Sequence, residues 1–270
     1  MLNFHGGDLL PLTASEKFNQ LFVKRIALKA DLLVVPSNYF KKMVSGKYGI
    51  EERKIIVYPS GGVDLNTFKP LDQTKIGKDV NSKQSWVLGC VSRIDEGKGW
   101  DTFLKALKIL KALRPDLHFK AIFVGIGPME KEFNRLINDL GLEQEISYLG
   151  EKNNNELPAI INSFDVFVFP TRLPESLGLV GLEAMACGVP IIASAIGGIK
   201  DYVIDDYSGF LFEAGNEQAL CDKIIQVISM NEEERKRIIQ QSLEVVKSYE
   251  SEYVIKKLAE ELRKLIVYPN

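Results

Sequence analysis

The stretch Pro170-Thr-Arg-Leu-Pro-Glu-Ser-Leu-Gly-Leu-Val-Gly-Leu-Glu-Ala-Met-Ala-Cys-Gly-Val-Pro190 decides the fold class of this chain. An apolar run within Asp165–Phe169 leads into it, and a second one, Val189–Ala193, leads out of it. Continuous apolar runs of this kind are typical of parallel strands that are covered on both faces. We therefore expect a loop and a helix between two strands, at the carboxyl edge of an open sheet, where α/β proteins bind ligands.

Two carboxylates frame this loop and helix. Glu175 and Glu183 stand eight positions apart around Gly178. We expect Glu175 just before the helix and Glu183 about two turns inside it, which places the carboxylates on the order of 9 Å apart along the axis. Amide donors at the helix N-terminus lie between them in this arrangement and favour an anion. A nucleotide-sugar, with hydroxyls at both ends and phosphates at its centre, has the matching layout.

The same stretch, with its Glu-x7-Glu spacing, resembles the signature of the retaining glycosyltransferases of the GT4 family (glycosyl transferases group 1), which have the GT-B fold. Further motifs follow the order of that family, and the resemblance covers nearly all of the chain. These motifs are Pro59-Ser-Gly-Gly-Val-Asp64 with Phe68, Ser92-Arg-Ile-Asp-Glu-Gly-Lys-Gly99, Gly125-Ile-Gly-Pro128, and Gly197-Gly198 followed by Ser208-Gly209.

The composition is that of a globular protein, with 46% hydrophobic and 26% charged residues and a net charge of −2. Such a balance gives no support for a nucleic-acid partner. Cys90, Cys187 and Cys221 lack metal-site spacing and stand in apolar contexts, so we expect core thiols in a reducing compartment. Without a membrane-span-length run or a signal peptide, we expect a cytoplasmic protein. Peripheral association with the inner membrane surface through the basic, apolar segment Phe18–Lys29 is the alternative.

Strand and helix patterns alternate from residue 85 onward, which predicts an α/β fold with a doubly wound, parallel, Rossmann-like sheet. The expected strands are 86–91, 119–124, 146–149, 166–169, 191–193 and 210–212. Helices are expected between them and, at the end of the chain, over 217–229, 232–249 and 252–267. The last helix has an apolar stripe that needs a surface to lie on, formed by Val254, Leu258, Leu262 and Leu265.

Residues 1–68 have a different pattern. They predict only two short strands, 32–35 and 55–57, which are too few to form a stable sheet alone. The resemblance implies two Rossmann-like halves, and Phe4-His5-Gly-Gly-Asp8 is similar to a motif from the middle of the first half. We therefore expect a truncated N-terminal acceptor domain that lacks roughly a hundred residues. The expected units are an acceptor-side remnant at 1–68, a linker at 69–84, a donor-binding domain at 85–250 and a C-terminal return helix at 251–270.

The resemblance also implies a role for each charged candidate. Glu175 contacts the transferred sugar, and Glu183 holds the ribose hydroxyls of the nucleotide. Arg93 and Lys98 bind the diphosphate, a role that suits a planar fork and a point charge. The competing interpretations are two solvated loop cations, an exposed helix glutamate at 183, and a helix-start acid at 175 that only favours the dipole. His5 either lies near the transferred sugar or is an ordinary histidine, and the sequence favours neither.

The remaining candidates act through the backbone. Ser176, Leu177 and Gly178, followed by Leu179, replace the more common Gly-Phe-Gly of the family and are expected to offer amides to the sugar and phosphates. Gly127 lies in a strand-to-helix turn on the nucleotide side. It belongs to no dinucleotide-binding fingerprint, because the third glycine of that motif falls at a glutamate. By family analogy, Gly150 marks the edge that faces the base.

These expectations lead to one main hypothesis. The chain transfers a hexose from a UDP- or GDP-hexose to a carbohydrate or lipid-linked acceptor, with retention, in polysaccharide or glycolipid assembly. No Asp-x-Asp motif occurs, so we expect neither a metal nor another cofactor. The alternatives are a donor-binding module that needs a partner chain to supply the missing acceptor half, and a GT-B nucleotide-sugar epimerase. GDP-mannose, UDP-glucose and UDP-N-acetylhexosamine all stay open as donors.

Overall fold

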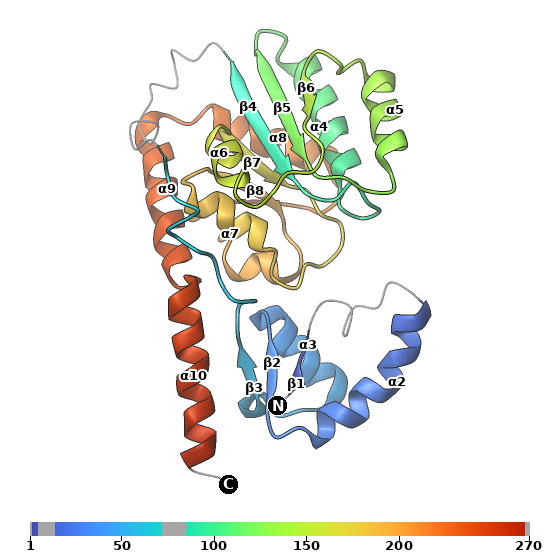
Figure 1. Ribbon diagram of the computed structural model, residues 1–270. Helices are drawn as coiled ribbons and strands as arrows, with labels where there is room; N and C mark the ends of the chain where they lie inside the picture. The colour runs from blue at the N-terminus through green and yellow to red at the C-terminus, as the bar shows by residue number, and fades with distance from the viewer. Residues whose placement is uncertain (1, 5–13, 72–84, 268–270) are drawn as a thin grey trace.

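Two parallel sheets organise the computed structural model, which describes residues 2–4, 14–71 and 85–267 (Figure 1). The larger sheet has six strands in the order β6-β5-β4-β7-β8-β9, and the smaller has the order β1-β2-β3. The larger one consists of β4 (Trp86–Val91), β5 (Phe119–Val124), β6 (Ile146–Tyr148), β7 (Val166–Phe169), β8 (Ile191–Ser194) and β9 (Phe210–Phe212). The prediction of an α/β fold with a doubly wound parallel sheet is confirmed.

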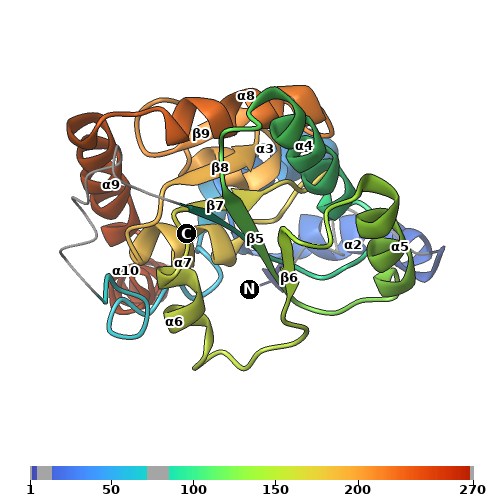
Figure 2. The same cartoon turned by 90° about the horizontal axis from the view of Figure 1, so that it is seen from above.

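Helices cover both faces of the larger sheet (Figure 2). One core lies under α4 (Trp100–Leu113), α5 (Glu130–Leu140) and α8 (Glu217–Ile228). The other lies under α6 (Leu157–Asn162), α7 (Leu179–Ala186) and α9 (Glu232–Lys247). The chain first adds strands on one side of β4 and then crosses back to place β7 on its other side. Ligands of open α/β sheets bind at such a switch point, beyond the carboxyl ends of the strands.

Glu183 lies closer to the start of α7 than the sequence predicted. The helix begins at Leu179, so Glu183 is its fifth residue and lies little more than one turn inside, rather than two. Glu175 belongs to the preceding loop, so the helical rise does not apply to the whole interval between the two carboxylates. The cause is Gly178, which caps the helix at a φ of 83° and ends the loop there.

The smaller sheet has a third strand that the sequence did not predict. Its strands are β1 (Leu2–Asn3), β2 (Leu33–Val35) and β3 (Ile55–Val57), and its helices are α2 (Ala14–Lys29), α3 (Asn38–Tyr48) and the 3₁₀ helix η1 (Glu52–Lys54). Strand β1 is two residues long and pairs with Leu33 and Val34. A pair of residues carries no periodicity, so only the pairing with β2 identifies it as a strand.

We call the six-stranded sheet with its helices the larger lobe and the three-stranded sheet with its helices the smaller lobe. Helix α10 (Ser251–Val267) runs from the larger lobe down beside the smaller lobe (Figure 1). Just before it, Glu250 pairs with Val63 in an isolated parallel bridge. Val254 is buried, and Leu258 and Leu262 are half-buried, so the expected stripe lies partly against the protein. The side chain of Leu265 lies outside the described residues.

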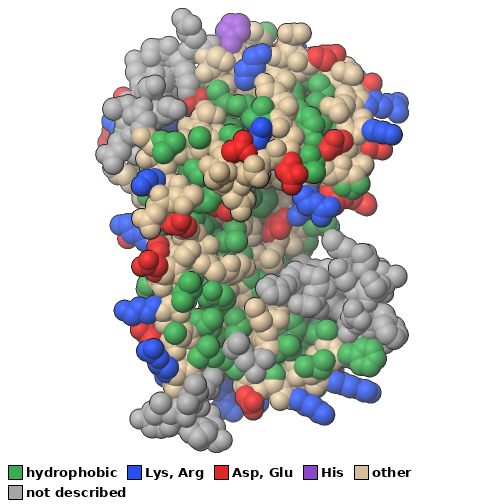
Figure 3. Space-filling view, in the orientation of Figure 1, with side chains coloured by type: hydrophobic (Ala, Val, Ile, Leu, Met, Phe, Trp, Pro, Cys, Tyr) green, Lys and Arg blue, Asp and Glu red, His purple; other side chains and the backbone are tan. Residues whose placement is uncertain are grey.

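The burial of the cysteines and the mixture of charges on the surface are those expected from the composition. All three cysteines are buried, as expected for core thiols. Acidic and basic side chains are interspersed over the face shown in Figure 3. Within residues 2–4, 14–71 and 85–267, no helix combines the length and apolarity that a membrane crossing requires.

Candidate active site

The expected site residues follow successive strands of the larger sheet. Arg93 and Lys98 lie after β4, Gly127 after β5, Gly150 after β6 and Glu175 after β7. Because all these strands are parallel, their carboxyl ends meet at one edge of the sheet. The topology therefore gathers these residues at the switch-point edge.

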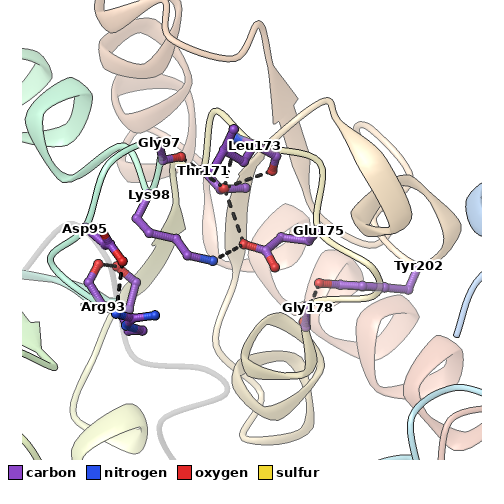
Figure 4. Close-up of polar contacts among 10 residues, drawn as sticks. Arg93, Asp95, Gly97, Lys98, Thr171, Leu173, Glu175, Gly178 and Tyr202 are labelled. Carbon is purple, nitrogen blue, oxygen red and sulfur yellow. Dashed lines mark hydrogen bonds and ion pairs between the residues drawn. The ribbon is translucent and has the colours of Figure 1, made fainter. Parts of the chain in front are cut away.

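Lys98 and Glu175 form a partly buried ion pair (Figure 4). The Lys98 Nζ atom lies 2.8 Å from Glu175 Oε1, and the two side chains are 28% and 19% exposed. The hydroxyl of Thr171 lies 3.3 Å from the same carboxylate oxygen. A charge-assisted bond at this depth is stronger than a neutral one and fixes both side chains. Glu175 is thus a carboxylate held in place by a cation from a different loop.

The two loops interlock through their backbones. The carbonyl of Gly97 accepts a hydrogen bond from the amide of Arg172 at 2.7 Å. A Cβ atom on Gly99 would lie 1.8 Å from the carbonyl oxygen of Pro170, so only glycine permits this approach. These two backbone contacts therefore hold together the loops that carry Lys98 and Glu175.

A cradle of free amides precedes helix α7. Within the described part of the chain, no group accepts a hydrogen bond from the amides of Ser176, Leu177 or Gly178. The first amides of α7 add donors of the same kind. The Leu177 side chain is buried, and Leu179 packs against the core, so these residues offer their backbones to a ligand. Amides at a helix N-terminus bind anions such as phosphates. We call residues 176–178 the amide cradle.

Glu183 carries a half-buried carboxyl group on α7. No described side chain or amide forms a hydrogen bond or ion pair with it, and burial raises its pKa to about 7. Desolvation disfavours the charged form of a carboxyl group, which is why the pKa rises. This group has acceptor capacity that a ligand hydroxyl could satisfy.

Arg93 lies apart from the Lys98–Glu175 pair. Its side chain is 68% exposed, and Nη2 lies 3.0 Å from Asp95 Oδ2 (Figure 4). It lines a groove of about 600 Å³ together with Gly127, Glu151 and Lys152. Each of the two expected cations therefore has its own carboxylate partner, Asp95 for Arg93 and Glu175 for Lys98.

The glycines of the neighbouring loops shape that groove. Gly127 lines it, and the amide of Gly127 donates to Glu130 Oε1 at 3.3 Å. The carbonyl of Gly150 accepts from the amide of Gly125 at 2.8 Å, which joins the β5 and β6 loops. His5 lies outside the described residues, so its role stays a prediction.

Sequence reasoning missed Thr171 and Tyr202, whose hydroxyl groups contact Glu175 and Gly178. Thr171 and Tyr202 are both completely buried. The Tyr202 hydroxyl donates to the carbonyl of Gly178 at 2.8 Å, and so fixes the cap of α7. The position of Thr171 directly after β7 was a usable signal, because strand ends carry sites in this fold. For Tyr202 the signal was weaker: a buried phenol needs a hydrogen-bond partner, but the sequence does not say which.

Comparisons with known proteins give consistent results. The family model described as glycosyl transferases group 1 matches residues 72–264. The uncharacterized glycosyltransferase MJ1178 of Methanocaldococcus jannaschii is 29% identical, over 97% of this chain and 68% of its own length. A GDP-mannose-dependent alpha-(1-6)-phosphatidylinositol monomannoside mannosyltransferase of Mycolicibacterium smegmatis is 30% identical, over 81% of this chain and 57% of its own. The chain spans about half the length of several other curated relatives, among them D-inositol 3-phosphate glycosyltransferases.

Solved structures show the same architecture. Alr3699/HepE of Anabaena, in complex with UDP and glucose, has a TM-score of 0.79 at 25% identity, over 97% of this chain and 71% of its own. The C-terminal domain of the group 1 glycosyl transferase LpcC of Francisella tularensis has a TM-score of 0.59 at 28% identity, over 69% of this chain and 97% of its own.

Proposed function

Because the chain belongs to the glycosyl transferases group 1 family, we propose that it transfers a hexose from a nucleotide-sugar to an acceptor hydroxyl, with retention of configuration. One observation carries this proposal. The amide cradle has no acceptor within the described residues, and it directly follows the glutamate that pairs with Lys98. An anion site thus adjoins a fixed carboxylate at the ligand-binding edge of the sheet.

The donor placement follows from the free hydrogen-bonding capacity of each group. The diphosphate lies on the amide cradle. Lys98 donates one of its three N–H groups to Glu175, so two N–H groups are left for the phosphate oxygens. Arg93 contributes the guanidinium donors that Asp95 does not use. Glu183 accepts from the ribose hydroxyls, and Glu175 orients the hexose.

The proposed reaction breaks the bond between the anomeric carbon and the leaving phosphate oxygen, which keeps the electron pair. The acceptor oxygen bonds to the anomeric carbon on the same face, and its proton passes to an oxygen of the leaving phosphate. Negative charge grows on that phosphate in the transition state. Fixed amides and cations stabilise it there more than in the ground state. We propose that these groups do so without a metal.

The names of the relatives include both of the expected donor classes. The Anabaena protein was solved with UDP and glucose, whereas the Mycolicibacterium protein is named for GDP-mannose and a phosphatidylinositol monomannoside. We therefore keep UDP- and GDP-hexoses as the donor class and a carbohydrate or lipid-linked hydroxyl as the acceptor, in polysaccharide or glycolipid assembly.

Calorimetry with UDP-glucose, UDP-N-acetylglucosamine and GDP-mannose tests donor binding. We expect one of them to bind, and folded protein that binds none would overturn the proposal. Turnover of the bound donor with and without a sugar acceptor then separates the activities. Acceptor-dependent release of nucleoside diphosphate supports a transferase, and donor isomerisation without acceptor supports an epimerase. Binding without turnover favours a donor-binding module that needs a partner chain.

A further inference from the structure

A short 3₁₀ helix holds the amide cradle from one side. Helix η4 (Gly197–Asp201) follows β8. The amide of Gly198 donates to the carbonyl of Glu175 at 2.8 Å. A Cβ atom on Gly198 would lie 2.3 Å from the carbonyl oxygen of Ser176, so η4 and the cradle are in direct backbone contact. Directly after η4, Tyr202 holds Gly178 through the hydrogen bond described above.

The same short helix contacts the smaller lobe. Asp201, its last residue, accepts a hydrogen bond at 2.5 Å from the amide of Asn38, the first residue of α3. The side chain of Ser37 accepts from the amide of Phe40, so it caps a different donor of that helix. Helix α3 has no acidic residue in its own first turn. Asp201 supplies, from the other lobe, the negative charge that a helix N-terminus favours.

Tyr249 reinforces this junction. Its hydroxyl donates to the carbonyl of Asp201 at 3.0 Å, and its ring packs edge-on against Tyr202 at 6.0 Å. Its own carbonyl accepts from the amide of Val63 at 2.8 Å, in the segment that returns from the smaller sheet. The contact between the lobes and the support of the amide cradle therefore converge on two consecutive residues, Asp201 and Tyr202.

We propose that Asp201 and Tyr202 are positioning residues that couple the docking of α3 to the shape of the amide cradle. While α3 is docked, Asp201 has its amide partner, and Tyr202 holds Gly178 in the cap geometry. If α3 moves away, the half-buried Asp201 carboxylate loses that partner and the segment rearranges, which releases Gly178. The consequence for the donor rests on the proposed function, whereas the coupling itself is a property of the fold.

Hydrogen exchange at the Asn38 amide tests the coupling without any ligand. Tyr202→Phe removes the hydroxyl that holds Gly178 and leaves the Asp201–Asn38 bond chemically intact. We expect Asn38 to exchange about fivefold faster or more in this variant, in line with typical coupling between sites. The matched control is Tyr207→Phe, a tyrosine that is 43% exposed. Equal Asn38 exchange in the two variants would overturn the proposal.

Calorimetry with UDP and GDP tests whether the contact between Asp201 and α3 affects the amide cradle. Asp201→Ala should weaken binding of the better of these two diphosphates about fivefold or more, yet leave binding of the matching nucleoside unchanged. A general loss of folded structure would weaken both. The control is Asp222→Ala, an exposed carboxylate on α8 that accepts from Gln218. An equal effect of the two substitutions on the diphosphate would contradict the proposal. If wild-type protein binds neither diphosphate, the proposed function fails, and the Asn38 exchange rates alone decide the coupling.

Discussion

At the scale of single residues, the protonation of Glu183 should govern both stability and donor binding. Its pKa is raised from 4.5 to about 7 by burial, so between these values the folded state binds more protons than the unfolded state. Stability should therefore fall as the pH rises from 4.5 to about 7. We predict that Glu183→Gln abolishes this decline and raises the free energy of unfolding at pH 8 by about 2 kcal/mol, allowing for partial exposure. Urea unfolding at pH 5 and pH 8 measures it.

The same substitution should impair binding of the ribose. An ionised carboxylate is a stronger acceptor than an amide oxygen, so nucleoside affinity of the wild type should rise as the pH passes through 7. Glu183→Gln should bind nucleoside about tenfold more weakly at pH 8, with little pH dependence. A variant that is more stable and binds equally well would show that Glu183 is a half-buried helix glutamate without a role in binding.

Arg93 offers a second test at this scale, because the chain contains a close match for it. Arg93 pairs with Asp95, and Arg114 pairs with Asp116 at the same spacing. Arg114 caps the C-terminal end of α4, whereas Lys98 precedes the N-terminal end of that helix. We predict that Arg93→Ala weakens nucleoside-diphosphate binding about tenfold without changing nucleoside binding, since one charge-assisted bond to phosphate is lost. Arg114→Ala should change neither. Calorimetry that finds equal effects for both variants would place Arg93 among ordinary solvated cations.

At the scale of elements, the packing of η4 against the amide cradle should not tolerate a methyl group. We predict that Gly198→Ala lowers the free energy of unfolding by about 1–3 kcal/mol, because the new Cβ atom meets backbone that must shift. Diphosphate binding should weaken at least tenfold, since the displaced backbone is the cradle itself. Thermal unfolding and calorimetry measure the two effects.

Gly46 provides the control for this substitution. It lies inside α3, where a Cβ atom would meet nothing within 4 Å. Gly46→Ala should stabilise the protein by about 0.5–1 kcal/mol through helix propensity and leave binding unchanged. If Gly198→Ala behaved like Gly46→Ala, the close contact between η4 and the cradle would not exist in solution.

The elements themselves were largely predictable from the sequence. Strands β4, β5, β7 and β9 lie where largely apolar runs predicted them, because strands that are covered by helices on both faces are mostly apolar. Strand β5 departs from this pattern at one position, the exposed Lys120. The predicted depth of Glu183 inside its helix was wrong because the start of α7 depends on the positive φ of Gly178. The sequence permits this φ but does not require it. Strand β1 was missed because two residues become a strand only through their partner.

At the scale of the whole molecule, topology explains which site contacts could be predicted. Lys98 and Glu175 are 77 residues apart, and the sequence analysis placed each of them after a parallel strand at the ligand-binding edge. Their ion pair was not predicted, because it depends on β4 and β7 being neighbours in the sheet, which only the structure shows. The partner of Arg93 and the bond from Tyr202 to Gly178 could not be predicted. They depend on side-chain directions and on the packing of η4, which no periodicity encodes.

The proposed function requires that a nucleoside diphosphate bind to the amide cradle beside the Lys98–Glu175 pair. Its most direct test is a titration of isotope-labelled protein with UDP and with GDP, followed through the backbone amide resonances. We predict that the better-binding diphosphate produces its largest shifts at Ser176, Leu177 and Gly178, and that the matching nucleoside leaves these three resonances nearly unchanged. Saturable diphosphate binding that leaves the three amides unmoved would contradict the account.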